Sequence, residues 1–260
     1  MVEIRKKILK DVKKIVVKVG TSILADANGS LDSSKVGHVV SQICRVADRG
    51  IDVIVVSSGA IGAGMGILGL KARPADISKK QAIAAIGQIQ LMKLYDDFFK
   101  AQNKIPAQVL LTQDDFSDKK RHLNAKHTLF TILEYKGVPI INENDTTAIE
   151  EIKFGDNDKL SSLVANLVNA QLLVILSDVD GLWGENKETI GIVQRVTNDI
   201  ERLARGTTKQ ISTGGMVTKL QAAKTATEAG AACVIANGHT ENVLVKVLDG
   251  ENIGTLFLPQ

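Results

Sequence analysis

Short runs rich in β-branched residues alternate along the chain with longer stretches of helical periodicity. Most of these runs are apolar on both faces, which is typical of parallel strands covered by helices on both sides. The predicted strands are residues 15–19, 51–57, 105–111, 138–142, 171–177, 231–236 and 255–258. The alternation predicts an α/β fold, a three-layer α/β/α sandwich with an open, mainly parallel central sheet.

Helix signals fill the intervals between these runs. Apolar residues recur at helical spacing from Val36 to Ala47, with Asp32 or Ser33 as the start signal and Gly50 as the stop signal. Further helical patterns cover residues 83–99, 123–135, 160–168 and 216–228. The segment 185–196 is interpreted as an exposed hairpin or loop.

The N-terminal segment is rich in basic residues, which we interpret as the solvated face of a helix. Its apolar residues recur at helical spacing beside them: Ile4, Ile8, Leu9 and Val12. The basic residues are Arg5, Lys6, Lys7, Lys10, Lys13 and Lys14.

Size and composition exclude several classes of protein. The 260 residues carry 44% hydrophobic and 23% charged side chains, which excludes a disordered chain. The net charge of +3 and the aromatic content of 3% argue against a nucleic-acid partner. No apolar run approaches the ~18–20 residues that cross a bilayer, so we expect no membrane association. Cys44 and Cys233 are interpreted as buried thiols in a reducing compartment, and we expect a cytoplasmic protein without a signal peptide.

Polar and glycine-rich segments follow four of the predicted strands. They are Lys18 with residues 20–22, and residues 57–64, 142–145 and 177–181. In an open parallel sheet, ligands bind beyond the carboxyl ends of the strands. These segments therefore predict a ligand site on one edge of the sheet.

Residues 64–69 match the dinucleotide pattern G-x-G-x-x-G, but the match is weak. It lies several residues beyond the preceding strand, and no strand with an acidic end follows at ~20 residues. An anion-cradling turn at residues 57–64 that opens a helix is the better interpretation, because backbone N–H groups at a helix N-terminus bind anions.

A second glycine-rich turn, at residues 213–219, leads into a helix. It lacks the Walker A spacing, yet its glycines, two hydroxyl groups and Lys219 suit phosphate binding. The alternative is an ordinary loop with a solvated lysine.

Residues 155–159 place two carboxylates and an amide at a predicted helix start. Asp and Asn are preferred N-caps, so simple capping is the alternative interpretation. One carboxylate would suffice for capping, however, and a neighbouring lysine would give Asp158 a second role. Residues 142–145 are likewise either a turn or a set of substrate contacts.

Taken together, these segments resemble the amino acid kinase family, over residues 14–260. The segments that carry the resemblance are residues 17–22, 55–61, 141–145, 155–158 and 213–219. Within the family, the Asn-Glu-Asn-Asp and Gly-Asp-Asn-Asp segments are similar to those of members that act on glutamate. Many bacterial members carry a further C-terminal PUA domain of a type found in RNA-modifying proteins. This sequence ends at Gln260, and we expect no RNA-related function.

The resemblance implies ATP-dependent phosphorylation of the L-glutamate γ-carboxylate, the first step from glutamate to proline, with Mg²⁺ bridging the nucleotide phosphates. A carboxylate is already a nucleophile at neutral pH, so the reaction needs positioning and positive charge rather than a general base. The resemblance also implies one domain, residues 1–260, with a glutamate-binding half at about 1–170 and a nucleotide-binding half at about 171–260.

Site residues follow from the same resemblance. Lys18 and Lys219 would act as catalytic clamps on the phosphates, and Asp158 would hold their ammonium groups. The nucleotide would contact Lys18, Ser177, Asp178, Thr213, Gly214, Gly215, Met216, Val217, Thr218 and Lys219. Glutamate would contact Ser58, Asp145 and Asn157. Protein ligands to Mg²⁺ stay unassigned.

Two alternatives remain open. A sister kinase acting on acetylglutamate, aspartate, carbamate or UMP would share the fold and both lysines. A non-catalytic amino-acid sensor would have no use for Lys18, Lys219 and Asp158 together. The resemblance further implies inhibition by proline, at a loop covering residues 146–153 that overlaps the substrate site, and a homodimer or homotetramer.

Overall fold

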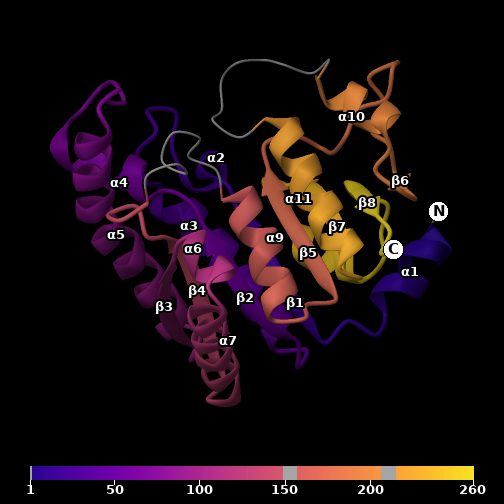
Figure 1. Ribbon diagram of the computed structural model, residues 1–260, viewed down its shortest axis with the longest axis horizontal. Helices are drawn as coiled ribbons and strands as arrows, with labels where there is room; N and C mark the ends of the chain where they lie inside the picture. The colour runs from indigo at the N-terminus through magenta and orange to yellow at the C-terminus, as the bar shows by residue number, and fades with distance from the viewer. Residues whose placement is uncertain (1, 149–156, 206–214) are drawn as a thin grey trace.

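An eight-stranded sheet forms the centre of the molecule (Figure 1). The computed structural model describes residues 2–148, 157–205 and 215–260. The strand order is β3-β4-β2-β1-β5-β7-β8-β6, and the pair β7 and β8 is antiparallel while the other pairs are parallel. The strands are β1 Lys14–Val19, β2 Asp52–Ser57, β3 Ile105–Leu111, β4 Gly137–Glu143, β5 Leu172–Ser177, β6 Ile192–Val193, β7 Ala232–Asn237 and β8 Thr255–Phe257.

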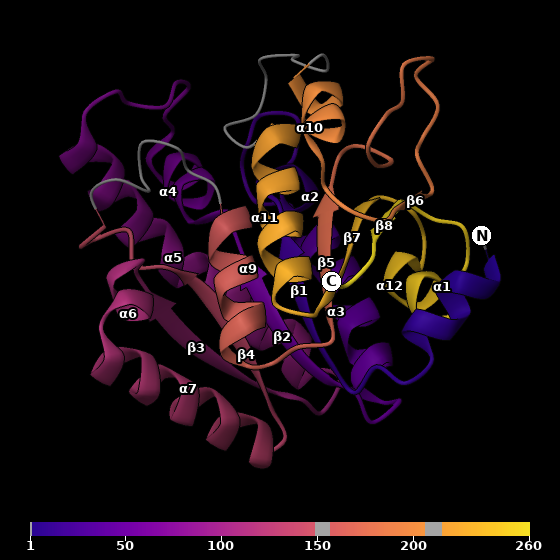
Figure 2. The same ribbon diagram turned by 45° about the vertical axis from the view of Figure 1, so that its right-hand side comes forward.

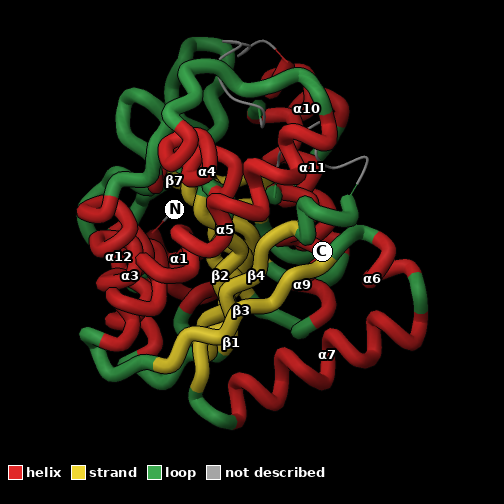
Figure 3. The backbone as a smooth tube through the Cα atoms, turned by 90° about the vertical axis from the view of Figure 1, so that its left-hand side faces the viewer, coloured by secondary structure: helices red, strands yellow, loops and turns green. Residues whose placement is uncertain are grey.

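Helices cover both faces of this sheet. In the view along the sheet, α1, α3 and α12 lie on one side, and α6, α7 and α9 lie on the other (Figure 3). The helices are α1 Val2–Leu9, α2 Thr21–Leu24, α3 Ser33–Ala47, α4 Ala60–Leu68, α5 Ile77–Lys100, α6 Asp114–Ser117, α7 Lys119–Glu134, α9 Asp158–Leu167, α10 Asn198–Arg205, α11 Met216–Glu228 and α12 Val243–Leu248. The predicted three-layer sandwich is confirmed.

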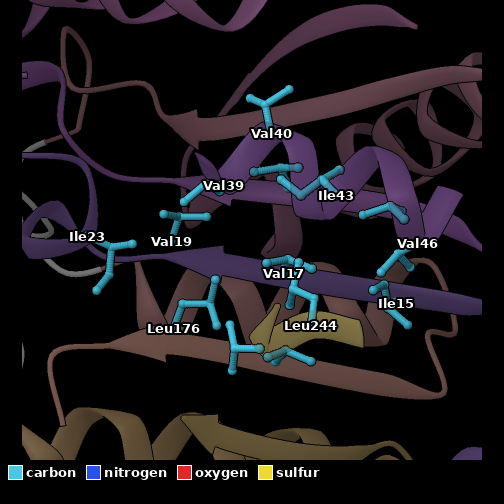
Figure 4. Packing of buried hydrophobic residues seen from close by; sticks show 14 of the residues in the cluster. Ile15, Val17, Val19, Ile23, Val39, Val40, Ile43, Val46, Leu176 and Leu244 are labelled. Atoms are coloured by element: carbon cyan, nitrogen blue, oxygen red, sulfur yellow. The ribbon is translucent and has the colours of Figure 1, made fainter. Parts of the chain in front are cut away.

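The hydrophobic core consists of two clusters, one on each face of the sheet. On the central strand β1, Ile15, Val17 and Val19 point toward α3 (Figure 4). Successive side chains of a strand point to opposite faces, so Val16 and Lys18 lie on the face that α9 and α11 cover. Strand alternation therefore carries Lys18 to the side of the sheet from which Asp158 comes.

All seven predicted strands are confirmed, with ends shifted by at most one residue. The prediction for residues 185–196 is wrong in one part, because β6 lies there and pairs with β8. Its two residues are too short to show an alternating pattern. The short helix α12 also escaped prediction, since its sequence VLVKVL has the composition of a strand.

The prediction of a fully solvated basic face on the N-terminal helix is wrong for Arg5. Its side chain is fully buried and donates hydrogen bonds to four backbone carbonyls. The acceptors are those of Gly191, Glu251, Ile253 and Gly254, at 2.7–3.1 Å. Arg5 precedes the buried Leu9 by four residues and therefore shares its inward face. In Figure 1 both chain ends lie toward the right, near β8, whereas Figure 3 shows them on opposite sides of the sheet.

Gly64, the first glycine of the weak dinucleotide match, serves helix packing. Gly64 lies within α4, where a Cβ atom would be 2.0 Å from the carbonyl oxygen of Ile83 on α5. A Cβ on Gly87 of α5 would lie 1.9 Å from the carbonyl oxygen of Ala60. The two helices therefore touch along their backbones, which fixes the N-terminus of α4 against α5.

Two further predictions from the sequence concern the cysteines and membrane association. Cys44 and Cys233 are buried free thiols, as predicted. Within residues 2–148, 157–205 and 215–260, none of the helices combines the length and the apolar character needed to cross a membrane.

Candidate active site

The site lies at the carboxyl end of β1. Strand β1 pairs with β2 on one side and with β5 on the other. The order in which the chain adds strands to the sheet therefore reverses at β1. Such a point is a topological switch point, where open parallel sheets bind ligands. Figure 2 shows α9 and α11 side by side in front of this part of the sheet.

Asp158, the first residue of α9, is fully buried between two lysines. Lys18 Nζ lies 2.6 Å from Asp158 Oδ1, and Lys219 Nζ lies 3.4 Å from Oδ2. The Thr218 hydroxyl donates a hydrogen bond to the same Oδ2 at 2.9 Å. The structure thus brings together three residues that the sequence predicted as a group, from β1, α9 and α11.

The charges of this cluster suit a polyanion. Lys18 and Lys219 are 4% and 6% exposed, so little water screens them. Among these three side chains, two positive charges face one negative charge. A phosphate group can therefore approach the lysines while Asp158 keeps their ammonium groups in position.

A cavity of about 200 Å³ adjoins this cluster at the N-terminus of α4. The predicted substrate residues Ser58, Asp145 and Asn157 all line it. The turn before α4 opens a helix, as predicted for residues 57–64, and residues 60–62 line the cavity. The first N–H groups of a helix have no partner within it, so this end of the cavity is suited to a carboxylate.

Asp145 is a half-buried carboxyl group in this cavity. Burial raises the pKa of Asp145 to about 6, and the positive charge of Arg73 opposes that rise. Arg73 also lines the cavity, although no motif in the sequence selects it.

Side-chain amides form the wall of the cavity next to α9. Asn157 Nδ2 donates hydrogen bonds to the Ser57 carbonyl at 2.7 Å and to Asn142 Oδ1 at 2.8 Å. Asn142 Nδ2 donates to Gln88 Oε1 at 2.8 Å, and the Glu143 N–H donates to Asn142 Oδ1 at 2.9 Å. The sequence did not indicate Gln88 as a site residue. It lies within the helical pattern of α5, and nothing in that pattern indicates a contact with Asn142, which lies 54 residues later in the chain.

The predicted nucleotide residues lie at the ends of β5 and α11. Ser177 ends β5, and its hydroxyl donates to Asp178 Oδ1 at 3.1 Å. Gly215 is the N-cap of α11, which begins with Met216 and Val217. Thr213 and Gly214 lie outside the described residues, as does the part of the predicted proline loop from residue 149 to residue 153.

No group of three or more His, Cys, Asp or Glu side chains that could hold a metal ion occurs in the part of the chain that the structure describes. The described residues therefore provide no Mg²⁺ cage of their own. Mg²⁺ generally keeps several waters and binds through substrate phosphates, which is compatible with this arrangement.

Known proteins resemble this chain over nearly its whole length. It is 49% identical over 252 residues to the glutamate 5-kinase of Caldanaerobacter subterraneus subsp. tengcongensis, covering 95% of this chain and 68% of the relative. It is 46% identical over 262 residues to the glutamate 5-kinase of Clostridium acetobutylicum, covering 98% of both chains.

Solved structures share the fold at low sequence identity. Carbamate kinase from Giardia lamblia superposes with a TM-score of 0.68 at 18% identity, covering 96% of this chain and 99% of that one. UMP kinase from Bacillus anthracis gives a TM-score of 0.64 at 20% identity, covering 95% and 96%. The model of the amino acid kinase family matches residues 13–237, and the chain belongs to that family.

Proposed function

We propose that this protein phosphorylates the γ-carboxylate of L-glutamate with ATP, giving L-glutamyl 5-phosphate and ADP, the first step of proline biosynthesis. Curated relatives at 46–49% identity carry the name glutamate 5-kinase, and they support this substrate. The observation that carries the proposal is the buried carboxylate of Asp158 between Lys18 and Lys219, beside an amide-lined cavity.

The two lysines act on the transferred phosphoryl group. An oxygen of the glutamate γ-carboxylate attacks the γ-phosphorus, and the bond from that phosphorus to the β-phosphate oxygen breaks. Lys18 and Lys219 neutralise the charge on the phosphate oxygens, which otherwise repel the incoming carboxylate. Asp158 keeps both ammonium groups in place, and no general base is needed.

The nucleotide occupies the side of β1 that faces β5. Thr218 and Lys219 belong to the first turn of α11, and Ser177 and Asp178 follow β5. When bound with the nucleotide, Mg²⁺ would supply further neutralisation of the phosphate charge beside Lys18 and Lys219. We include Thr213 and Gly214 in this site on the resemblance alone.

Glutamate occupies the cavity at α4. A carboxylate suits the N-terminus of α4 and the neighbouring Ser58. The α-ammonium group suits Asp145 and the Oδ1 atom of Asn157, since both Asn157 N–H groups already donate to other oxygens. N-acetylation would remove that charge and with it the ligand's contact to the Asp145 carboxylate, so acetylglutamate should be a poor substrate.

Regulation, assembly and location belong to the same proposal. Proline shares the α-amino-carboxylate pattern of glutamate, so we propose that it inhibits and raises the apparent KM for glutamate. We also propose a single domain with a glutamate half and a nucleotide half, a homodimer or homotetramer, and a cytoplasmic location.

An ADP-release assay across acceptors tests the substrate. Glutamate, acetylglutamate, aspartate, carbamate and UMP are compared, and hydroxylamine traps any acyl phosphate as a hydroxamate. Glutamate alone should give both ADP and hydroxamate. Faster turnover of another acceptor would assign the chain to a sister activity, and no turnover of any acceptor would support the sensor.

Variants test the lysines in the same assay. Lys18→Met and Lys219→Ala should each lower kcat by ~10²–10³, as for loss of one preorganised donor. Lys13→Met is the matched control, since Lys13 is exposed just before β1. Turnover close to wild type in Lys18→Met would remove Lys18 from the mechanism.

A further inference from the structure

Three side-chain amides form a continuous chain from α5 to the start of α9. Gln88 Oε1 accepts from Asn142 Nδ2, and Asn142 Oδ1 accepts from Asn157 Nδ2, each at 2.8 Å. Asn142 and Asn157 line the substrate cavity and are buried. Gln88 lies behind them and is not among the residues that line this cavity.

Backbone groups determine which end of each amide is oxygen. The Glu143 N–H can only donate, so the atom that it contacts must be Asn142 Oδ1. The Ser57 carbonyl can only accept, so its partner must be Asn157 Nδ2. Asn142 consequently turns its NH₂ group toward Gln88, whose Oε1 is the acceptor that this orientation requires.

This polarity decides what Asn157 offers to a ligand. Its two N–H groups are used by Ser57 and Asn142, so its remaining capacity is that of an acceptor. An acceptor oxygen favours an ammonium group over an acylated nitrogen that carries a bulky carbonyl. Rotating the Asn157 amide by half a turn would instead direct N–H groups at the ligand.

Gln88 is held firmly on its helix. The preceding residue, Gly87, touches the backbone of α4, where a Cβ atom would lie 1.9 Å from the Ala60 carbonyl oxygen. The backbone at Gln88 is thus fixed against the helix that opens at the substrate cavity. A single short segment of α5 therefore positions both α4 and Asn142.

We propose that Gln88 is a positioning residue for substrate recognition: its Oε1 accepts from Asn142 and, together with the Glu143 N–H and the Ser57 carbonyl, holds the two asparagine amides so that the acceptor face of Asn157 is turned toward the α-ammonium group of the substrate. This inference rests on the proposed glutamate kinase function. The Gln88 side chain accepts its hydrogen bond from Asn142, on the substrate side of the site, so we expect its effect to be confined to the amino-acid substrate.

Removing the Gln88 acceptor leaves the Asn142 NH₂ group buried without its partner. In Gln88→Met, the KM for glutamate should rise by about 5- to 100-fold, the range for an unpaired buried amide donor. The kcat and the KM for ATP should stay close to wild type. The preference for glutamate over acetylglutamate should fall, because a less firmly held Asn142 leaves the Ser57 carbonyl as the main anchor of the Asn157 amide.

A double-mutant cycle tests the coupling. Gln88→Met is measured in the wild-type and Asn142→Ala backgrounds, with Gln90→Met on the same helix as the control. We expect Gln88→Met to raise the glutamate KM strongly in the first background and little in the second, since its partner is gone there. Equal effects in both backgrounds, or an equal rise in the KM for ATP, would overturn the inference.

A conservative variant separates positioning from folding. Gln88→Glu keeps an acceptor oxygen at the same place, so it should retain more glutamate affinity than Gln88→Met. If Gln88→Met does not fold, Gln88→Glu and Gln88→Leu are compared instead, and equal glutamate KM values would refute the role of the oxygen. A wild-type enzyme that does not phosphorylate glutamate overturns both proposals, whereas an active wild type with an additive cycle overturns this one alone.

Discussion

Asp158→Asn is the sharpest test of how the phosphate site works. The substitution keeps the shape of the side chain and removes the charge that compensates Lys18 Nζ at 2.6 Å and Lys219 Nζ at 3.4 Å. Two buried ammonium groups then face each other across a neutral amide. The oxygen of the introduced amide can still accept from the Thr218 hydroxyl, so the loss reports mainly on charge.

The geometry sets the size of the expected effects. Removing one partner of a buried ion pair costs about 3–5 kcal/mol of the free energy of unfolding, because the other charge stays uncompensated. For a chain of this length, that corresponds to a fall in Tm of about 5–10 °C. Misplaced lysines should also lower kcat by ~10²–10³.

The effect of nucleotide binding on the Tm distinguishes this prediction from a simple loss of stability. The phosphates of ATP supply the negative charge that Asp158→Asn has lost, so saturating MgATP should raise the Tm of the variant more than that of wild type. Differential scanning fluorimetry with and without MgATP measures this difference. Asp96→Asn, which breaks the exposed pair with Lys100, is the control and should change Tm little.

Three results would each refute a different part of this mechanism. A variant with wild-type kcat would show that Asp158 does not hold the lysines in their working positions. A variant with the wild-type Tm would show that other groups of the folded protein compensate the positive charges of the two lysines. An equal nucleotide shift in both proteins would remove Lys18 and Lys219 from phosphate binding.

Three further changes have defined outcomes. Burial raises the pKa of Asp145 from 3.8 to about 6, so its contribution to the stability of the fold is present below pH 3.8 and is lost as the pH rises through about 6. Asp145→Asn should therefore raise the Tm relative to wild type at pH 8 and not at pH 3. The same variant should weaken glutamate binding. Gly87→Ala places a Cβ atom 1.9 Å from the Ala60 carbonyl oxygen and should cost about 1–3 kcal/mol in urea unfolding, and an unchanged midpoint would contradict the close packing. Arg5→Met leaves four carbonyls without their charged donor and should cost about 2–3 kcal/mol, whereas Lys7→Met on the exposed face of the same helix should not.

The fold could be predicted well from the sequence because buried parallel strands have a strong signature. Strands such as β2 and β5 are largely apolar on both faces and are bounded by glycine or polar turns. Elements without such a pattern were missed, among them β6 with two residues, α2 and α6 with four each, α12 with six and α10 with eight. Arg5 was placed in solvent because charge suggests exposure, whereas helical spacing puts it on the face of Leu9.

The sequence predicted those residues of the candidate site that lie in motifs, and it missed those that do not. Lys18, Asp158 and Lys219 each lie near a strand end or a helix start, and the resemblance to a family grouped them. Their distances could not be predicted, because they depend on how α9 packs against α11. Gln88 and Arg73 lie in segments without a motif, and only three-dimensional contacts connect them to the cavity.

The ion-pair cluster also joins the two parts of the proposed domain. Lys18 and Asp158 come from the glutamate half, and Lys219 comes from the nucleotide half. The pair within the first half is the shorter one, at 2.6 Å against 3.4 Å. Coulomb attraction weakens with distance, so Lys219 is the lysine more readily drawn to a phosphate while Asp158 still holds Lys18. In the proposed reaction the nucleotide would therefore engage the cluster through Lys219 on α11, while Asp158 keeps Lys18 in position for the incoming carboxylate.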